Sequence, residues 1–239
     1  MLVLFRLTSF VTAVIVTGSF VLVISKTIHP IVVMFVSTVL VALLIARLLR
    51  WEVRTFQFWS LLGSPLLFLA SSYGILLFLE QLYAQVILSV AVVVLLTLFL
   101  EHIFSYIHLP TLYQPFSIEH LGQLINILTL FFVSSVGFGL RLFLQMPLWI
   151  LGVVFFLVSW FVIYGTLWAS KVEHQRAKPY ALAGAILMAQ LFLAISFLPS
   201  GFYTSAAFVA LAFYVFLGLT RASAHHRLSK TLLRRYVVI

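Results

Sequence analysis

Eight apolar stretches constrain this chain more than any other feature of its sequence. Each is long enough to cross a hydrocarbon core of about 30 Å as a helix, and a helix satisfies its own backbone hydrogen bonds in lipid. The predicted spans are 8–25, 30–46, 57–79, 82–100, 120–141, 147–170, 179–198 and 202–220. We therefore predict an all-α, polytopic integral membrane bundle of about eight transmembrane helices, forming a single domain over residues 1–220.

The composition supports the same fold class and excludes several functions. Hydrophobic residues make up 64% of the chain, charged residues only 8%, and the mean hydropathy is +1.23, all outside the range of soluble domains. The chain has no cysteine and no aspartate, so thiolate metal sites, cysteine nucleophiles and paired aspartates are excluded. No phosphate-binding glycine loop or nucleophile elbow occurs. We expect no cofactor, no metal and no catalytic residues.

The basic residues predict how the chain is threaded. Twelve of the fourteen Lys and Arg fall on one side of the predicted membrane and two, Lys26 and Arg141, fall on the other. This positive-inside bias places both termini in the cytoplasm. The tail 221–239 is basic, which predicts contact with anionic lipid head groups, although it could also begin a further span. We expect the net charge of +9 to reflect membrane topology and contacts with anionic lipid head groups, and not binding to nucleic acid.

Short connections indicate a bacterial-type cytoplasmic membrane. The single asparagine, Asn126, is not part of an acceptor site for N-glycosylation, in agreement with this location. Because Lys26 leads directly into a second span, we expect the first span to be retained and not cleaved as a signal peptide. The one long connection, 101–118, predicts an interfacial loop with a short surface helix and divides the bundle into a 4+4 arrangement. Histidines flank this loop, but their spacing does not suit a metal.

One helix carries a polar stripe. At 100° per residue, seven residues of the span 120–141 and its approach fall within an arc of roughly 80°. They are Glu119, Gln123, Asn126, Leu130, Ser134, Gly137 and Arg141. Polar groups in hydrocarbon need a partner or a wet cavity, so this face should look into protein. Arg141 either reaches the outer interface or binds an anion at the mouth of a cleft.

The span 57–79 has a matching polar face near the same side of the membrane. The two faces, with neighbouring polar residues, form a candidate polar cleft whose members are Gln57, Ser60, Ser64, Glu119, His120, Gln123, Asn126, Ser134, Arg141 and Gln190. These side chains either line a narrow hydrated path or form hydrogen bonds between helices, and the second interpretation uses the same residue types.

Three classes of function are compatible with these features. The first is a non-catalytic membrane protein, a scaffold or the membrane subunit of a complex with a membrane-protein partner, because polar content and extramembrane material are slight. The second is a carrier or channel for a small neutral or weakly anionic, lipid-like solute. The third is a membrane enzyme that uses Glu119 and His120 as acid and base. The sequence favours the first class.

Overall fold

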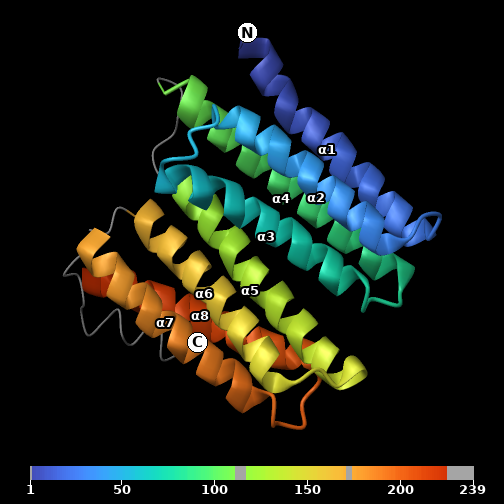
Figure 1. The fold of residues 1–239 in the computed structure, drawn as a ribbon, viewed down its shortest axis with the longest axis vertical. Coiled ribbons are helices and arrows are strands. Elements are labelled where there is room, and N and C mark those ends of the chain that lie inside the picture. The colour runs from blue at the N-terminus through green and yellow to red at the C-terminus, as the bar shows by residue number, and fades with distance from the viewer. Residues whose placement is uncertain (1, 111–116, 171–173, 225–239) are drawn as a thin grey trace. The chain divides into compact units, whose positions relative to one another are not determined.

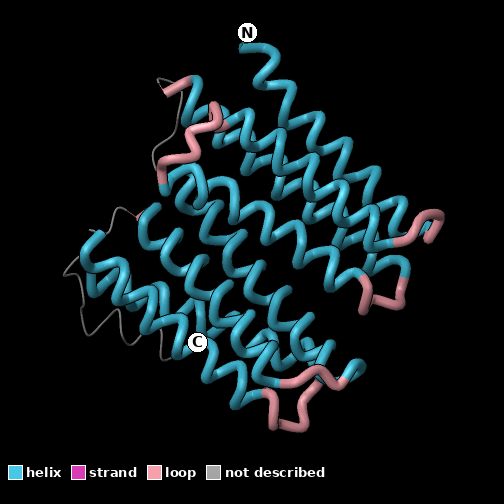
Figure 2. The backbone as a smooth tube through the Cα atoms, viewed as in Figure 1, coloured by secondary structure: helices cyan, strands magenta, loops and turns pink. Residues whose placement is uncertain are grey.

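The computed structural model describes residues 2–110, 117–170 and 174–224, and the predicted contacts of most of the basic tail lie outside them. Within these ranges the chain forms eight helices and no strand (Figure 1 and Figure 2). The helices are α1 (Leu2–Ser25), α2 (Pro30–Leu48), α3 (Phe56–Leu76), α4 (Leu82–His108), α5 (Ser117–Leu144), α6 (Leu148–Ala169), α7 (His174–Ile195) and α8 (Phe202–Ala224). Each is long and apolar enough to cross a membrane, so the predicted fold class is confirmed.

Local sequence explains where several helices begin. Pro30 opens α2, where its fixed φ suits the first turn and its missing N–H would have had no partner. Thr55 caps α3 by accepting a hydrogen bond from the backbone N–H of Phe58 at 3.3 Å. Pro147 precedes α6 in an extended conformation, which separates that helix from α5.

Several boundaries differ from the sequence prediction, and two of the differences concern proline or a loop. The predicted loop over 101–118 is shorter, because α4 continues to His108 before any proline interrupts it. The seventh helix was expected to begin at Pro179, but α7 begins at His174 and contains that proline. At this position the proline removes only the hydrogen bond to the Gln175 carbonyl, near an end where helix bonds are incomplete anyway.

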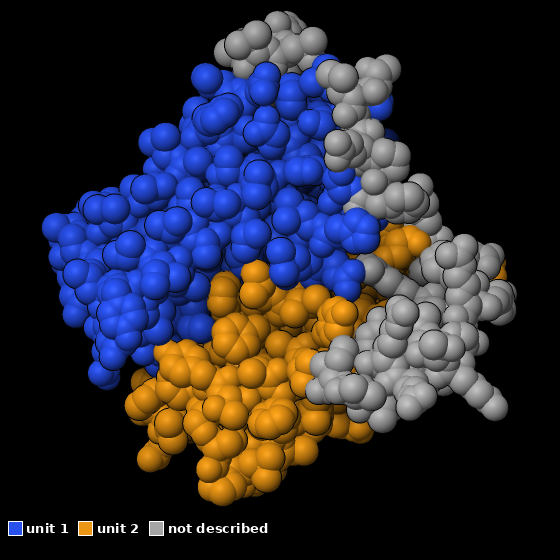
Figure 3. Space-filling view, turned by 180° about the vertical axis from the view of Figure 1, so that it is seen from behind, with its two compact units in different colours: residues 1–125 blue, residues 126–239 orange. Residues whose placement is uncertain are grey.

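The chain separates into two compact units, residues 1–125 and residues 126–239, coloured separately in Figure 3. In the first unit α1 packs against α2 and α4, and α3 packs against the same two helices. Its core contains the fully buried rings of Phe20, Phe68, Tyr73 and Phe99. Large rings of this kind make many close van der Waals contacts, and such packing contributes to helix association in lipid.

In the second unit α6 lies along α7, and α8 packs against α7. Three aromatic rings stack in series at its centre, with centroids of Phe138 and Phe192 4.5 Å apart and those of Phe155 and Phe192 4.6 Å apart. Glycines permit these approaches: a Cβ on Gly137 would lie 2.9 Å from the Phe192 ring, closer than real side chains come. The boundary between the units falls inside α5, and the prediction of one domain over 1–220 stays a prediction.

Candidate functional site

The polar stripe of α5 is buried where it enters the second unit. Asn126 is 4% exposed, and Leu130 and Ser134 have no exposed surface. Asn126 Nδ2 donates a hydrogen bond of 2.8 Å to Thr166 Oγ1 on α6. The expectation that this residue faces protein and not lipid is therefore confirmed.

The Asn126 amide is only half satisfied. Thr166 Oγ1 accepts this hydrogen bond and donates one of 2.7 Å to the Val162 carbonyl, which completes a short chain of hydrogen bonds. Asn126 Oδ1, by contrast, is buried and has no hydrogen-bond partner among the residues that the structure describes. The Ser159 hydroxyl is buried without a partner as well, and it lies two turns before Thr166 on the same side of α6. Unpaired buried polar atoms each cost about 1–3 kcal/mol, so this strip of α5 and α6 has unused hydrogen-bonding capacity.

Other members of the stripe form hydrogen bonds within α5 or lie near one of its ends. Ser134 donates to the carbonyls of Leu130 and Phe131, at 2.6 and 3.1 Å. Glu119 lies in the first turn of α5, where a carboxylate is favoured by the helix dipole. The guanidinium carbon of Arg141 lies 5.6 Å from the centre of the Phe197 ring, a cation–π contact near the end of the helix.

The remaining predicted residues are distributed over both units. On α3 Gln57 is half-buried, and Ser60 and Ser64 are buried. His120 and Gln190 are exposed, on α5 and α7. Gln57, Ser60, Ser64, Glu119, His120 and Gln123 belong to the first unit, and Asn126, Ser134, Arg141 and Gln190 belong to the second. A single cleft containing all of them stays a prediction.

Sequence reasoning missed a polar cluster in the first unit. The Tyr73 hydroxyl on α3 hydrogen-bonds to Ser19 Oγ of α1 and, at 2.9 Å, to Ser37 Oγ of α2. Each serine oxygen also lies within hydrogen-bonding distance of a carbonyl of its own helix, so that three hydroxyl protons are shared among these four contacts. Each of these residues stands alone in an apolar run, so nothing in the sequence pairs them. Only the crossing of three helices brings their hydroxyls together.

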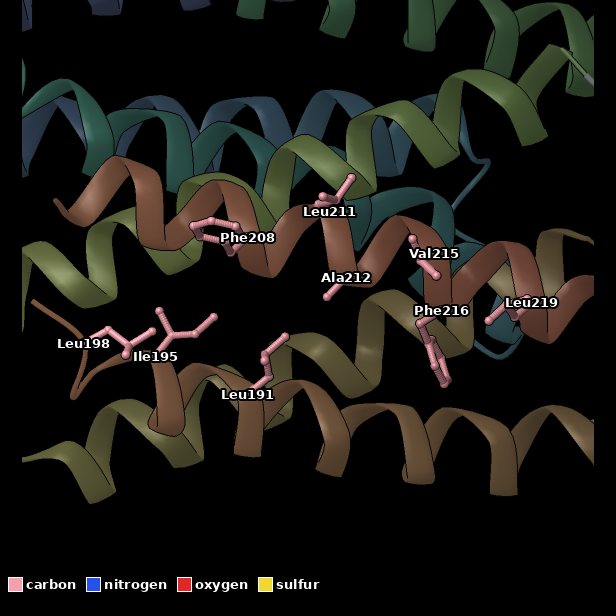
Figure 4. Close-up of a pocket in the computed structure, with 9 residues that line it drawn as sticks. All are labelled: Leu191, Ile195, Leu198, Phe208, Leu211, Ala212, Val215, Phe216 and Leu219. Atoms are coloured by element: carbon pink, nitrogen blue, oxygen red, sulfur yellow. The ribbon is translucent and has the colours of Figure 1, made fainter. Parts of the chain in front are cut away.

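Two cavities of the described structure are apolar. One of about 220 Å³ lies between α1 and α4, and another of about 660 Å³ runs along α7 and α8 (Figure 4). None of the residues predicted for the polar cleft lines either of them. Solutes that fit these two cavities are therefore hydrocarbon-like.

Charged groups of the first unit meet at one end of its helices. Arg6 on α1 and Glu101 on α4 form an ion pair with 3.5 Å between Nη2 and Oε1. The ring of His108 stacks on that of Phe104, with centroids 5.2 Å apart. Among the residues described, no three His, Asp or Glu side chains come together in a way that could hold a metal ion.

No protein-family model, curated protein or solved structure matches this chain. What the protein does must therefore be inferred from its own geometry.

Proposed function

We propose that this multi-pass membrane protein is non-catalytic and acts as a scaffold or as the membrane subunit of a complex. The observation that carries the proposal is where its polar side chains send their hydrogen bonds. Hydroxyls in the spans donate mostly to a carbonyl three or four residues earlier in the same helix. Examples are Thr12, Ser72, Thr97, Ser134, Thr166 and Thr220.

A few hydrogen bonds between helices hold the helices together. Tyr73 joins three helices of the first unit, and Asn126 joins α5 to α6. Contacts of this type contribute about 0.6–2 kcal/mol each in membranes. A chain whose few polar groups maintain helix packing has few left for binding a substrate, which favours a structural role.

The outer surfaces of the helices offer area for lipid and for a membrane-protein partner. Trp149 and Phe35 are 71% and 70% exposed, and both lie on spans. In a bilayer such side chains meet acyl chains or another protein. We assign the protein to the bacterial cytoplasmic membrane, with both termini in the cytoplasm because of the positive-inside bias.

Labelling of single cysteines tests this proposal, since the natural chain has no cysteine. Ser60→Cys, Asn126→Cys and Ser134→Cys should resist a water-soluble maleimide, because these positions pack against protein. His120→Cys is the positive control, since His120 is exposed near the start of α5. Rapid labelling of the three buried positions, at a rate near that of the control, would overturn the structural role.

Purification of the protein provides a second test of this proposal. A membrane subunit should bring a specific membrane-protein partner with it when it is extracted in mild detergent. Recovery of the chain alone and monodisperse would count against an obligate partner. If a protein does co-purify, an unchanged yield of the chain from cells that lack that protein would count against it as well.

A second candidate function is favoured by one observation, the unpaired Asn126 Oδ1. A carrier or channel for a small neutral or weakly anionic, lipid-like solute would use this oxygen as an acceptor. Gln57, Ser60, Ser64, Gln123 and Arg141 would then line the rest of the path. Maleimide labelling of Ser134→Cys, a variant that keeps Asn126, would support the carrier if a candidate solute slows it. Protection of this cysteine without any solute would refute the carrier.

A further inference from the structure

The connection between α2 and α3 presents aromatic and apolar side chains at one end of the first unit. It comprises residues 49–55 and joins two candidate membrane spans, so it lies where the chain leaves the hydrocarbon (Figure 1). Trp51 is 56% exposed and Val53 is 45% exposed. Trp59, in the first turn of α3, is also half exposed, and its indole N–H donates a hydrogen bond of 2.9 Å to the Val53 carbonyl. Exposed tryptophan is typical of the zone between water and hydrocarbon.

The backbone of this connection holds Trp51 in an unusual conformation. Arg50 ends α2 in the left-handed conformation, with φ of 55°, and its N–H donates to the Arg47 carbonyl at 3.1 Å. One left-handed residue is a common helix ending. Trp51 then repeats the conformation, with φ of 56°, and no other successive pair among the described residues does so. A large side chain is strained where glycine would be relaxed, and strain of this kind clusters at functional sites.

Three exposed arginines accompany these side chains. Arg47 lies in the last turn of α2, and Arg50 and Arg54 belong to the connection itself. Within the part of the chain that the structure describes, none of the three forms an ion pair. They outnumber the single carboxylate of the connection, that of Glu52. Guanidinium groups bind phosphate through two parallel hydrogen bonds, so this segment suits a phosphate ligand.

The other carboxylates of the first unit belong to other places in the fold. Glu101 on α4 is paired with Arg6 of α1. Glu119 lies in the first turn of α5, and Glu80 follows the opposite end of α3. An anion that approaches the α2–α3 connection therefore meets more positive than negative charge on that connection.

We propose that the α2–α3 connection binds the head group of an anionic phospholipid, with Arg50 and Arg54 on its phosphate and Trp51 among the neighbouring lipids. The connection is short and folds back on the ends of its two helices, so its side chains stay near the head-group layer, which is about 5–7 Å deep. A soluble anion would engage the arginines but would leave Trp51 and Val53 in water. A lipid covers both kinds of side chain, whichever role the protein has in the membrane.

Photocrosslinking to the natural chain tests the site. The full chain is placed in phosphatidylcholine bilayers with a small share of phosphatidylglycerol that carries a photoreactive head group. A major adduct should form within residues 47–59, and unlabelled phosphatidylglycerol should compete with it, whereas extra phosphatidylcholine should not. Absence of adducts in this segment, or equal competition by both lipids, would overturn the proposal. Competition by inorganic phosphate as strong as that by phosphatidylglycerol would also overturn it, because the site would then take a soluble anion.

The arginines have a matched pair of variants. Arg50→Gln combined with Arg54→Gln should lower the yield of adducts within 47–59 about 25-fold, since each basic residue at an anionic surface contributes about fivefold. The control is Lys26→Gln, because Lys26 is exposed and left-handed in the connection between α1 and α2. It should leave the yield unchanged. An unchanged yield in the double variant would overturn the contact between the arginines and the phosphate.

Trp51→Gly separates lipid contact from folding. It removes the indole and relieves the strained backbone, so the yield should fall while the protein stays at least as resistant to unfolding as the natural chain. Gln145→Gly is the control, because it relieves a single left-handed residue, with φ of 49°, between α5 and α6. It should not change the yield. A full yield in Trp51→Gly would overturn the contact between Trp51 and lipid.

Discussion

The contact between Gly184 on α7 and Phe216 on α8 gives the sharpest test of helix packing in the second unit. A Cβ at position 184 would overlap the Cε1 and Cζ atoms of the Phe216 ring and would lie 3.0 Å from Cδ1 of Ile163 on α6. Side chains from two helices therefore oppose even one methyl group. Overpacking of this kind costs about 1–3 kcal/mol.

Gly184→Ala should therefore destabilise the protein despite the better helix propensity of alanine. The propensity gain is at most about 1 kcal/mol, which leaves a net loss of up to about 2 kcal/mol. Since about 1.4 kcal/mol is a factor of ten in an equilibrium constant, the unfolded fraction should rise by up to about thirty-fold. Reversible unfolding in mixed detergent micelles, followed by tryptophan fluorescence and far-UV circular dichroism, measures this change.

Gly18→Ala is the matched control, because no atom lies within 4 Å of the position that its Cβ would take. This variant should be neutral or slightly more stable than the natural chain. Phe216→Leu should recover much of the loss in the Gly184→Ala background, since a smaller side chain makes room for the methyl group. If Gly184→Ala proves as stable as Gly18→Ala, the close approach of α7 and α8 is wrong.

Three further predictions concern polar contacts. Tyr73→Phe removes two hydrogen bonds between helices and should lower the free energy of unfolding by about 1–2 kcal/mol. A loss below about 0.3 kcal/mol, well under the contribution of one such contact, would show that the cluster does not hold the unit together. Asn126→Ala and Thr166→Val should be coupled in a double-mutant cycle by about 0.6–1.7 kcal/mol, and additive effects would exclude their hydrogen bond. Arg6→Gln should change stability by less than about 1 kcal/mol and less still in high salt, because the Arg6 and Glu101 side chains are 65% and 35% exposed. A larger loss that salt does not reduce would contradict a solvated ion pair.

The candidate site shows where sequence reasoning reaches its limit. The helical period placed Asn126, Leu130 and Ser134 on one face of α5, and all three are buried. The period could not predict that Thr166 would accept from Asn126, because these residues lie forty positions apart on different helices. It also could not separate Ser134, whose hydroxyl returns to its own backbone, from a residue that lines a path.

Helix ends were predictable to the extent that local chemistry determines them. Pro30 and Thr55 mark the starts of α2 and α3 through their own backbone and side-chain preferences. Pro179 was misleading, because the stop that proline imposes is weak so near the start of a helix. The length of α4 was underestimated, since polar residues such as Glu101 and His102 suggested a loop where the helix continues.

The sequence by itself determined that this chain is a polytopic helical membrane protein, because long apolar runs in lipid can satisfy their backbone only as helices. Tertiary structure alone decided which helices meet and which polar groups find partners. The Tyr73 hydroxyl hydrogen-bonds to two serines of other helices, and Asn126 hydrogen-bonds to one threonine while its side-chain oxygen is unsatisfied among the described residues. An apolar groove runs along α7 and α8. The physical reason is that lipid is as apolar as leucine, so hydrophobicity drives insertion but does not choose neighbours. That choice depends on side-chain shape and on hydrogen bonds between residues far apart in the chain.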